Sequence, residues 1–292
     1  MTTNLHNKTD IEIERDPSSP VLLVAGVRNE SSLGWSASQT WLDRHPNNEV
    51  LITVNSEIAQ NFVNAKEEAD GRISSVKIDW SDTDAGSSLW MILDELYAKE
   101  RRIGGVVHSI ARADKTNFFD PAHQLEAKVY TDAFNISTLS LHGLAKATRQ
   151  NLRPGGGIVT FGFGEPGRFV KGYGGAMGVA KAGLTQMVIE LAESLGQAEP
   201  NARTAEIVTG FIPTRSGKSV AFLQGGTPDA VVDSFAESAS LTGTTATQQS
   251  EAAGRLAVAF IDDPMFSQST GIRLHTDGGW SLGGRALFSS KD

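Results

Sequence analysis

The sequence contains no cysteine. This absence excludes disulfide bonds, thiolate metal sites, iron–sulfur clusters and a cysteine nucleophile. Histidine is also scarce. The six histidines are scattered and do not show the spacing of metal ligands. We therefore expect a protein that holds no metal ion.

Long hydrophobic runs are absent as well. No stretch reaches the roughly 18 apolar residues that a membrane-spanning helix needs. Residues 1–18 are polar and charged, and they lack the apolar centre of a signal peptide. We expect a mobile tail over 1–18, a single domain over 19–292, and a cytoplasmic protein without membrane contact.

Basic residues are outnumbered by acidic ones. Lys and Arg total 26 and Asp and Glu total 34, which gives a formal net charge of −8 and a pI near 5.3. Binding to a phosphate backbone needs clustered positive charge, so nucleic acid is not an expected partner. Hydrophobic residues make up 39% of the chain, which is enough to form a core.

Short apolar runs alternate with longer helical patterns along the whole chain. The predicted strands lie at about 20–26, 49–54, 74–79, 103–110, 156–161, 202–209 and 271–275. The predicted helices lie at about 32–44, 57–70, 83–99, 125–150, 174–196 and 250–262. Such alternation requires parallel strands joined by crossover helices. The sequence therefore predicts an α/β fold, with one doubly wound parallel sheet and a loosely patterned segment at about 213–248.

The end of the first predicted strand is a candidate phosphate site, because ligands of such sheets bind beyond the carboxyl ends of the strands. Gly26 follows this strand and permits a tight turn, and Ser31 or Ser32 can cap the next helix. A helix N-terminus in this place suits a pyrophosphate group. However, the fingerprint G-x-G-x-x-G is missing, so the segment is equally typical of an ordinary strand–turn–helix junction.

The second and third predicted strands end in polar residues that suit an adenosine group. Dinucleotide-binding sheets usually place an acid for the ribose, or an Arg for a 2′-phosphate, where Asn55 stands. Without a positive charge, this position favours NADH over NADPH. Asp79 can accept from the adenine amino group while Trp80 covers the ring. A helix-capping role fits both Asn55 and Asp79 equally well.

The later strands supply the remaining candidates. His108, in an apolar strand, is more typical of a buried histidine with satisfied hydrogen bonds than of a catalyst. The small residues that follow it let a flat cofactor pass close to the backbone. Tyr173 and Lys181 lie around the start of a predicted helix. Such a pair can protonate an oxyanion, with the ammonium group lowering the phenol pKa, although a capping Tyr and a solvated Lys fit the pattern too.

Several segments together resemble one known family. They are GVRNESSLGW, VVHSIA, ISTLSLHGLAKA, PGGGIVTFGFG, GVAKAGL and TGIRLHTDGGWSL. In their order and spacing, over about residues 20–283, the chain resembles the enoyl-acyl-carrier-protein reductases, a divergent branch of the short-chain dehydrogenase/reductase family. The resemblance implies a Rossmann fold, a homotetramer, and hydride transfer from NADH to a trans-2-enoyl thioester of acyl-carrier protein or coenzyme A.

The resemblance also implies roles for individual residues. Tyr173 would stabilise the enolate oxygen, Lys181 would hold the nicotinamide ribose, and Phe163 would be the second aromatic residue of the catalytic site. The implied cofactor contacts are Gly26, Ser32, Leu33, Asn55, Asp79, Trp80, Ser109, Ile110, Ala111, Lys181, Ile212 and Thr214. The segment 213–248 would be the substrate-binding loop.

One departure from the family concerns the spacing of Tyr173 and Lys181. The family has six residues between this Tyr and Lys, whereas here seven intervene. In a continuous helix one extra residue would turn the pair apart by about 100°, unless a bulge at Gly174 and Gly175 absorbs it. Two alternatives therefore stay open: a related enzyme that acts on another enone or carbonyl in secondary metabolism, and a non-catalytic nucleotide-binding relative.

Overall fold

The computed structural model describes most of the chain. The described residues are 19–82, 84–97, 102–114, 120–170, 173, 175–198, 201–214, 217–218, 227–241 and 245–283. The predicted tail over 1–18 lies outside them. Part of the predicted substrate-binding loop, residues 215–216, 219–226 and 242–244, lies outside them too.

Seven parallel strands form one sheet in this part of the chain. They are β1 (Val21–Ala25), β2 (Glu49–Val54), β3 (Ile73–Lys77), β4 (Ile103–His108), β5 (Leu152–Phe163), β6 (Arg203–Thr209) and β7 (Ile272–Thr276). Their order is β3-β2-β1-β4-β5-β6-β7. All residues of β1 and β4 are buried, as expected for strands that helices cover on both faces. The predicted doubly wound parallel sheet is confirmed.

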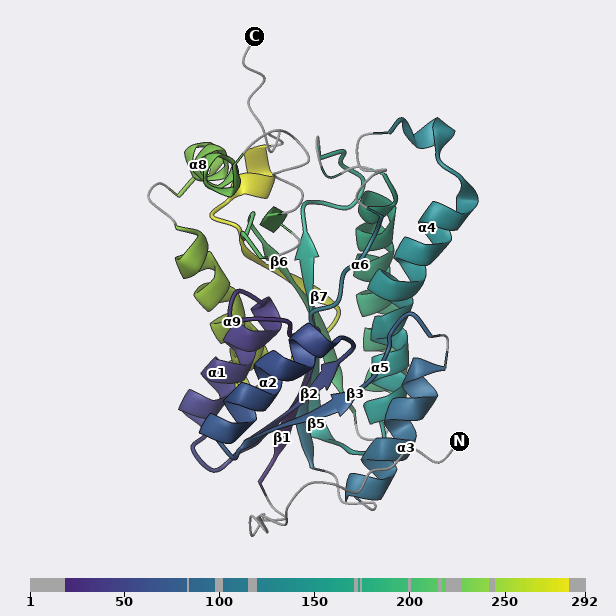
Figure 1. Cartoon of the computed structure of the whole chain (residues 1–292), viewed down its shortest axis with the longest axis vertical. Helices are drawn as coiled ribbons and strands as arrows, with labels where there is room; N and C mark the ends of the chain where they lie inside the picture. Colours follow the sequence, from purple (N-terminus) through teal and green to yellow (C-terminus); the bar gives the residue numbers. More distant parts are fainter. Residues whose placement is uncertain are drawn as a thin grey trace.

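Helices cover both faces of this sheet (Figure 1). One face carries α1 (Leu33–Arg44), α2 (Glu57–Ala69) and α9 (Ala246–Asp262). The other carries α3 (Ala85–Tyr97), α5 (Ser140–Thr148) and α6 (Ala176–Gly196), and α4 (Ala127–Phe134) packs on α6. None of the helices in the described ranges has both the length and the apolar character that crossing a bilayer would take.

A third, smaller core lies beyond the carboxyl ends of β5 and β6. Its buried members come from the segment after β6, from α8 (Pro228–Ser238) and from the turn η5 (Trp280–Gly283). The rings of Phe235 and Trp280 stack with their centroids 5.2 Å apart. Phe163 and Tyr173 are partly buried and pack against this core. This core therefore lies at the carboxyl end of the sheet, which is the end where the cofactor and substrate site is expected.

Two predicted elements differ from the observed ones. The segment 213–248 was expected to be loosely patterned, but it contains α8, which Thr227 caps by accepting from the Ala230 amide at 3.2 Å. The long helix expected over 125–150 is divided by a π-helical turn, η3 (Asn135–Leu139), between α4 and α5. The Thr227-Pro228 pair was the sequence signal for α8, because Pro is favoured in the first turn of a helix.

The predicted buried role of His108 is supported by its surroundings. Its Nδ1 lies 2.8 Å from the Thr160 hydroxyl and its Nε2 lies 2.8 Å from the Ser140 hydroxyl. Burial, with a smaller contribution from the charge of Lys181, lowers the pKa of His108 from 6.5 to about 3. The imidazole is therefore neutral near pH 7, and its neutral form links β4, β5 and α5.

This buried imidazole predicts a loss of stability in mild acid. The unfolded chain binds a proton at His108 below about pH 6.5, whereas the folded chain does not until about pH 3. Between those values the free energy of unfolding should fall by about 1.4 kcal/mol per pH unit from this residue alone. Urea unfolding at pH 7.5 and 5.5 measures the difference. The His108→Gln variant, which cannot titrate, should show a shallower slope, and equal slopes would contradict the argument.

Candidate active site

The turn after β1 meets the end of β4 at the centre of the sheet, where the strand order reverses. Gly26 has φ +102°, and a Cβ added to it would lie 2.2 Å from the Ser109 carbonyl oxygen. The Ser109 amide in turn donates to the Ala25 carbonyl at 2.7 Å. The positive φ and the close approach explain why glycine occupies position 26. Crevices at such switch points are where doubly wound sheets bind ligands.

The N-terminus of α1 follows the turn at this switch point. Ser32 is its N-cap residue, but the Ser32 hydroxyl accepts from the Arg28 and Asn29 amides rather than from the helix. The helix starts at Leu33, and its first turn contains no acidic residue. The first N–H groups are therefore available to an anion, and the helix dipole favours negative charge there. These features fit the pyrophosphate group of a dinucleotide.

Asn55 and Asp79 lie beyond the ends of β2 and β3, on the side expected for the adenosine group. Asn55 is exposed, and the residue that caps α2 is Ser56, so the capping alternative for Asn55 is wrong. The Asp79 carboxylate accepts from the Ser81 hydroxyl at 2.7 Å and from the Ser81 amide at 3.0 Å. These bonds lower the pKa of Asp79. Because α3 begins at Ala85, Asp79 does not cap it either.

Trp80 is placed differently from a ring that covers adenine at the surface. Its side chain belongs to the core and is 6% exposed. The indole N–H donates to the Thr53 hydroxyl at 3.1 Å, which ties the segment after β3 to β2. A cofactor contact by Trp80 remains a prediction, and the observed role is structural.

The remaining predicted cofactor contacts follow β4 and β6. Ile110 packs against the core, while Ala111 is exposed. After β6, Ile212 is buried and its carbonyl accepts from the Thr214 amide at 2.7 Å. Since β4, β5 and β6 are neighbours, both segments leave the same end of the sheet. Their contacts with a cofactor remain predictions.

The three predicted catalytic residues do lie together. Tyr173, Phe163 and Lys181 all line a hollow of about 240 Å³. The rings of Phe163 and Tyr173 are 4.6 Å apart between centroids and tilted by 57°. Burial raises the pKa of the Tyr173 phenol above its ordinary value of 10.0, so this phenol stays protonated through the neutral range. The ammonium group of Lys181 is not among the causes of this shift, so the expectation that it lowers the phenol pKa is wrong. A protonated phenol that lines the same hollow as a cation is suited to donating to an oxyanion.

A turn before α6 explains how the structure accommodates the seven residues between Tyr173 and Lys181. The helix begins at Ala176, and its N-cap, Gly175, has φ 61° and ψ −144°. Only glycine adopts such a conformation readily. Tyr173 therefore precedes the helix, and the rotation by about 100° that a continuous helix would impose does not apply. Gly174 lies outside the described residues.

Lys181 is buried between α6 and β5. Its Nζ donates to the Phe161 carbonyl at 2.6 Å, and the residue is 8% exposed. Burial lowers the pKa of Lys181 from 10.5 to about 8, against an opposing contribution from the carboxylate of Glu206. The expectation of a solvated lysine is therefore wrong.

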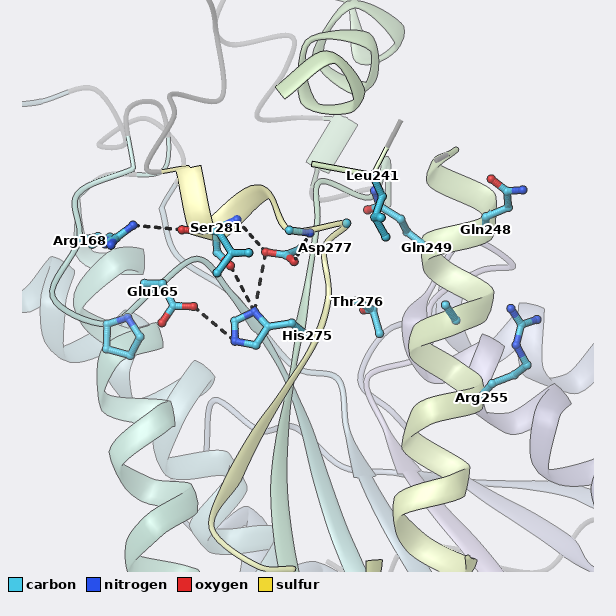
Figure 2. A pocket seen from close by; sticks show the side chains of 15 residues that line it. Glu165, Arg168, Leu241, Gln248, Gln249, Arg255, His275, Thr276, Asp277 and Ser281 are labelled. Carbon is cyan, nitrogen blue, oxygen red and sulfur yellow. Dashed lines mark hydrogen bonds and ion pairs between the residues drawn. The ribbon is translucent and has the colours of Figure 1, made fainter. Parts of the chain in front are cut away.

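A second and larger hollow, of about 1220 Å³, lies between β7 and α9 and was not foreseen from the sequence. Figure 2 shows Glu165 and Arg168 on one side of it and Gln249 and Arg255 of α9 on the other. His275 of β7 lies between them, with Nε2 3.4 Å from a Glu165 carboxylate oxygen. Glu165 lines both hollows, so the two adjoin at this residue.

Comparisons with known proteins identify the family of this chain. The seven-stranded parallel sheet and these comparisons together define a Rossmann-like oxidoreductase. The family model described as enoyl-(acyl carrier protein) reductase matches residues 26–281, and the chain belongs to that family.

Individual relatives are similar at modest identity. The chain is 28% identical to an enoyl-[acyl-carrier-protein] reductase [NADH] of Bacillus cereus, over 89% of this chain and 96% of the relative. It is 28% identical to the chloroplastic enoyl-[acyl-carrier-protein] reductase [NADH] of Arabidopsis thaliana, over 70% of this chain and 50% of the relative. The crystal structure of the Bacillus cereus reductase with NADP+ and indole naphthyridinone superimposes with a TM-score of 0.77 at 26% identity, covering 90% of this chain and 96% of that one.

Proposed function

We propose that the protein reduces the 2,3 double bond of a trans-2-enoyl thioester with NADH, in fatty acid synthesis or a related biosynthesis. The observation that supports this most directly is the hollow that Tyr173, Phe163 and Lys181 share at the end of β5. Membership of the reductase family supports it independently.

The proposal gives each residue a chemical task. When bound, the reduced dinucleotide supplies a hydride to the β-carbon of the thioester. The Tyr173 phenol donates a hydrogen bond and then a proton to the enolate oxygen that develops, and the resulting enol loses this O–H proton as its α-carbon takes one up, which gives the saturated thioester. The ammonium group of Lys181 holds the ribose next to the nicotinamide, and Phe163 packs on the Tyr173 ring and fixes its orientation.

NADH is the proposed cofactor, in preference to NADPH. The residue after β2, Asn55, brings no positive charge to a 2′-phosphate. The Bacillus cereus and Arabidopsis thaliana relatives are both named as NADH enzymes. NADPH remains the less favoured cofactor, and the NADP+ in the solved Bacillus cereus structure is the reason to measure both.

The thioester carrier and the assembly are further parts of the proposal. Acyl-carrier protein is the carrier in the names of the relatives, and coenzyme A is the alternative. A homotetramer is proposed by family resemblance. Val179 and Ile189, exposed on α6, are apolar residues that a second subunit would cover. The cytoplasmic location expected from the sequence stays a prediction.

A direct assay tests the reaction. Purified protein is mixed with NADH and crotonyl or longer enoyl thioesters of coenzyme A and acyl-carrier protein, and absorbance at 340 nm is followed. Oxidation of NADH that depends on the thioester supports the proposal. The absence of turnover at every chain length and on both carriers would reject it.

One observation favours a second candidate function. Tyr173 reaches its place through a turn at Gly175 rather than from the helix itself, so the phenol is held differently from one on a regular helix. A reductase acting on a small enone or carbonyl in secondary metabolism would tolerate this change. NADH oxidation with cyclic enones but not with thioesters would identify it. Calorimetry that shows no binding of either dinucleotide would instead indicate a non-catalytic relative.

The Lys181→Ala variant tests the proposed ribose contact. Loss of a charged hydrogen-bond donor should raise the Kd for NADH about tenfold or more. The variant also leaves the Phe161 carbonyl without its ammonium partner, so thermal unfolding is measured alongside. Fluorescence titration with NADH gives the Kd. An unchanged Kd in a folded variant would reject the role of Lys181.

A further inference from the structure

The π-helical turn η3, with the residue that follows it, carries three buried hydroxyl groups, those of Ser137, Thr138 and Ser140. The amide of Ser140 donates to the Asn135 carbonyl, five residues earlier, which is the bond that defines a π-helix. The Ser140 hydroxyl takes the Ile136 carbonyl instead, to which it donates at 2.5 Å. Single π-helical turns inside α-helices are frequent at functional sites, so the partners of the other two hydroxyl groups are of interest.

Two of the hydroxyl groups fix this turn to the end of β4. The Ser137 hydroxyl accepts from the Arg112 amide at 2.9 Å and donates to the Arg112 carbonyl at 3.1 Å. The Ser140 hydroxyl lies 2.8 Å from Nε2 of His108, and it accepts from the imidazole because its own proton is donated within the helix. The turn is therefore held to the strand end from which the predicted cofactor segment, residues 109–111, leaves.

The third hydroxyl group, that of Thr138, bonds to a different helix. It donates to the Ala180 carbonyl of α6 at 2.7 Å. Threonines in helices commonly donate to the carbonyl four residues earlier, as Thr131 and Thr148 do at 3.0 and 2.9 Å. The Ala180 carbonyl lies inside α6, where the helix itself provides a partner. The bond from Thr138 therefore adds a link between η3 and α6, and does not serve an otherwise unpaired carbonyl.

Lys181 is the residue directly after this link. Its main chain is held at the neighbouring Ala180 carbonyl, and its Nζ donates to the Phe161 carbonyl at 2.6 Å. The packing of α6 is close here, since a Cβ added at Gly183 would clash with the Phe134 ring of α4. Hydrogen bonds thus define both ends of the lysine, the main chain from η3 and the ammonium group from β5. A shift of α6 against η3 would move the ammonium group relative to the Phe161 carbonyl.

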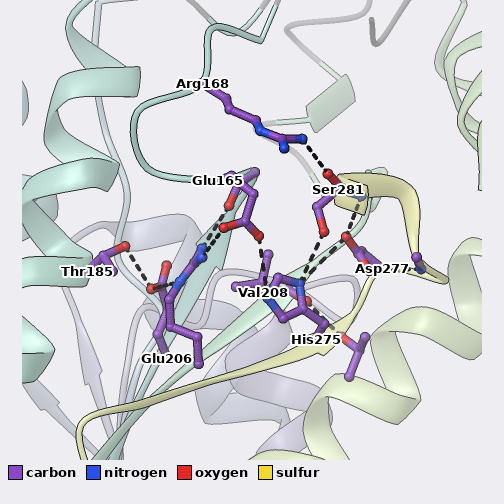
Figure 3. Close-up of polar contacts among 12 residues, drawn as sticks. Glu165, Arg168, Thr185, Glu206, Val208, His275, Asp277 and Ser281 are labelled. Carbon is purple, nitrogen blue, oxygen red and sulfur yellow. Dashed lines mark hydrogen bonds and ion pairs between the residues drawn. The ribbon is translucent and has the colours of Figure 1, made fainter. Parts of the chain in front are cut away.

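A second hydroxyl group joins the same part of α6 to the sheet. The Thr185 hydroxyl donates to Oε2 of Glu206 on β6 at 2.7 Å (Figure 3). Glu206 is buried, and Nε of Arg273 on β7 donates to the same oxygen at 2.8 Å. However, Thr185 lines the smaller hollow, whereas Thr138 is not among the described residues that line it. The bond from Thr138 can therefore be removed without changing the lining of the site.

We propose that Thr138 is a positioning residue for Lys181: its hydroxyl, on a turn that is fixed to β4, holds the α6 main chain where the ammonium group meets the Phe161 carbonyl. The inference rests on the proposed function, in which this ammonium group binds the cofactor ribose. Thr138 is fully buried, so it touches neither substrate nor cofactor, and its effect on the reaction passes through α6.

The test is Thr138→Val, which keeps the shape of the side chain and removes the hydroxyl group. The matched control is Thr148→Val, because Thr148 is also fully buried and its hydroxyl donates within α5. Each variant loses one buried hydrogen bond, so Tm should fall by a similar amount in both, about 2–4 °C. Thr138→Ser restores the hydroxyl group and is the rescue variant. If Thr138→Val does not fold, Thr138→Ala is compared with Thr148→Ala by the same readouts.

The position of Lys181 is measured first, without cofactor. With lysine labelled at 13Cε, the NMR signal of Lys181, assigned by its loss in Lys181→Ala, reports the surroundings of the ammonium group. The signal should shift in Thr138→Val and return to the parent position in Thr138→Ser, while Thr148→Val leaves it in place. A signal that stays in place in Thr138→Val, or that shifts equally in Thr148→Val, would overturn the inference.

NADH binding separates this inference from the proposed function. The Kd for NADH should rise about threefold to tenfold in Thr138→Val, as expected when one hydrogen bond to a charged group is weakened. In Thr148→Val and Thr138→Ser it should stay within about twofold of the parent value. A rise of the same size in Thr148→Val would indicate a general loss of stability and overturn the inference. If the Lys181 signal shifts while the Kd stays unchanged, Thr138 positions Lys181, and the failure belongs to the proposed ribose contact.

Discussion

Replacing Tyr173 with Phe is expected to lower kcat with an enoyl thioester by about 10²–10⁴, the range that general acid catalysis supplies. The substitution removes only the hydroxyl, and the ring contact with Phe163 and the packing against the third core persist. The Kd for NADH should therefore stay close to that of the parent protein. Stopped-flow measurement at saturating substrate separates this chemical effect from binding.

The pH dependence of activity gives a second test of Tyr173 as the proton donor. Because burial keeps the Tyr173 phenol protonated, the parent protein should lose activity in alkali near pH 8, where Lys181 titrates, and not through the phenol. The matched control is Tyr97→Phe, which alters a phenol in α3, on a part of the core remote from this hollow. A loss of kcat in Tyr97→Phe as large as in Tyr173→Phe would mean that the effect is structural. Full activity of Tyr173→Phe would remove Tyr173 as the proton donor.

The fold was predictable because burial on both faces of a parallel sheet leaves a simple pattern. The strand Val21–Ala25 is fully buried, and its unbroken apolar run was sufficient to identify it. The helix α8 was missed because its apolar positions are few, although Thr227 and Pro228 marked its start. The π-helical turn at Asn135–Leu139 could not be predicted, because the spacing of apolar residues does not distinguish one π-helical turn from a regular α-helical turn.

The site was predictable residue by residue but not in its electrostatics. Tyr173 and Lys181 were identified by their order after the fifth strand, and the structure brings them to one hollow. The conformation at Gly175 that permits this could not be inferred from a Gly-Gly pair alone. The buried ion pair of Glu206 and Arg273 joins two different strands, and its partners meet only through the register of β6 and β7. A glutamate within the run TAEIV was the one sequence signal for that network.

Replacing Gly26 with Ala is expected to disrupt both stability and cofactor binding. At φ +102° a side chain is strained by about 1–3 kcal/mol, and the added Cβ would lie 2.2 Å from the backbone carbonyl of Ser109. Since this carbonyl belongs to the segment after β4, relief of the clash must separate β1 from β4 at the switch point. We expect the free energy of unfolding to fall by more than about 3 kcal/mol, and the Kd for NADH to rise at least about tenfold, because α1 starts from this turn.

Gly155→Ala is the matched control, because it separates backbone strain from the steric clash of the added Cβ. Gly155 also has a positive φ, +70°, but no atom lies within 4 Å of the position that its Cβ would take. Its replacement should cost only the backbone strain, about 1–2 kcal/mol, and should leave NADH binding unchanged. Urea unfolding and calorimetric titration of both variants give the comparison. Equal losses of stability would show that backbone strain alone requires glycine at position 26. In that case the close approach of the two strand ends would not be the reason for glycine at this position.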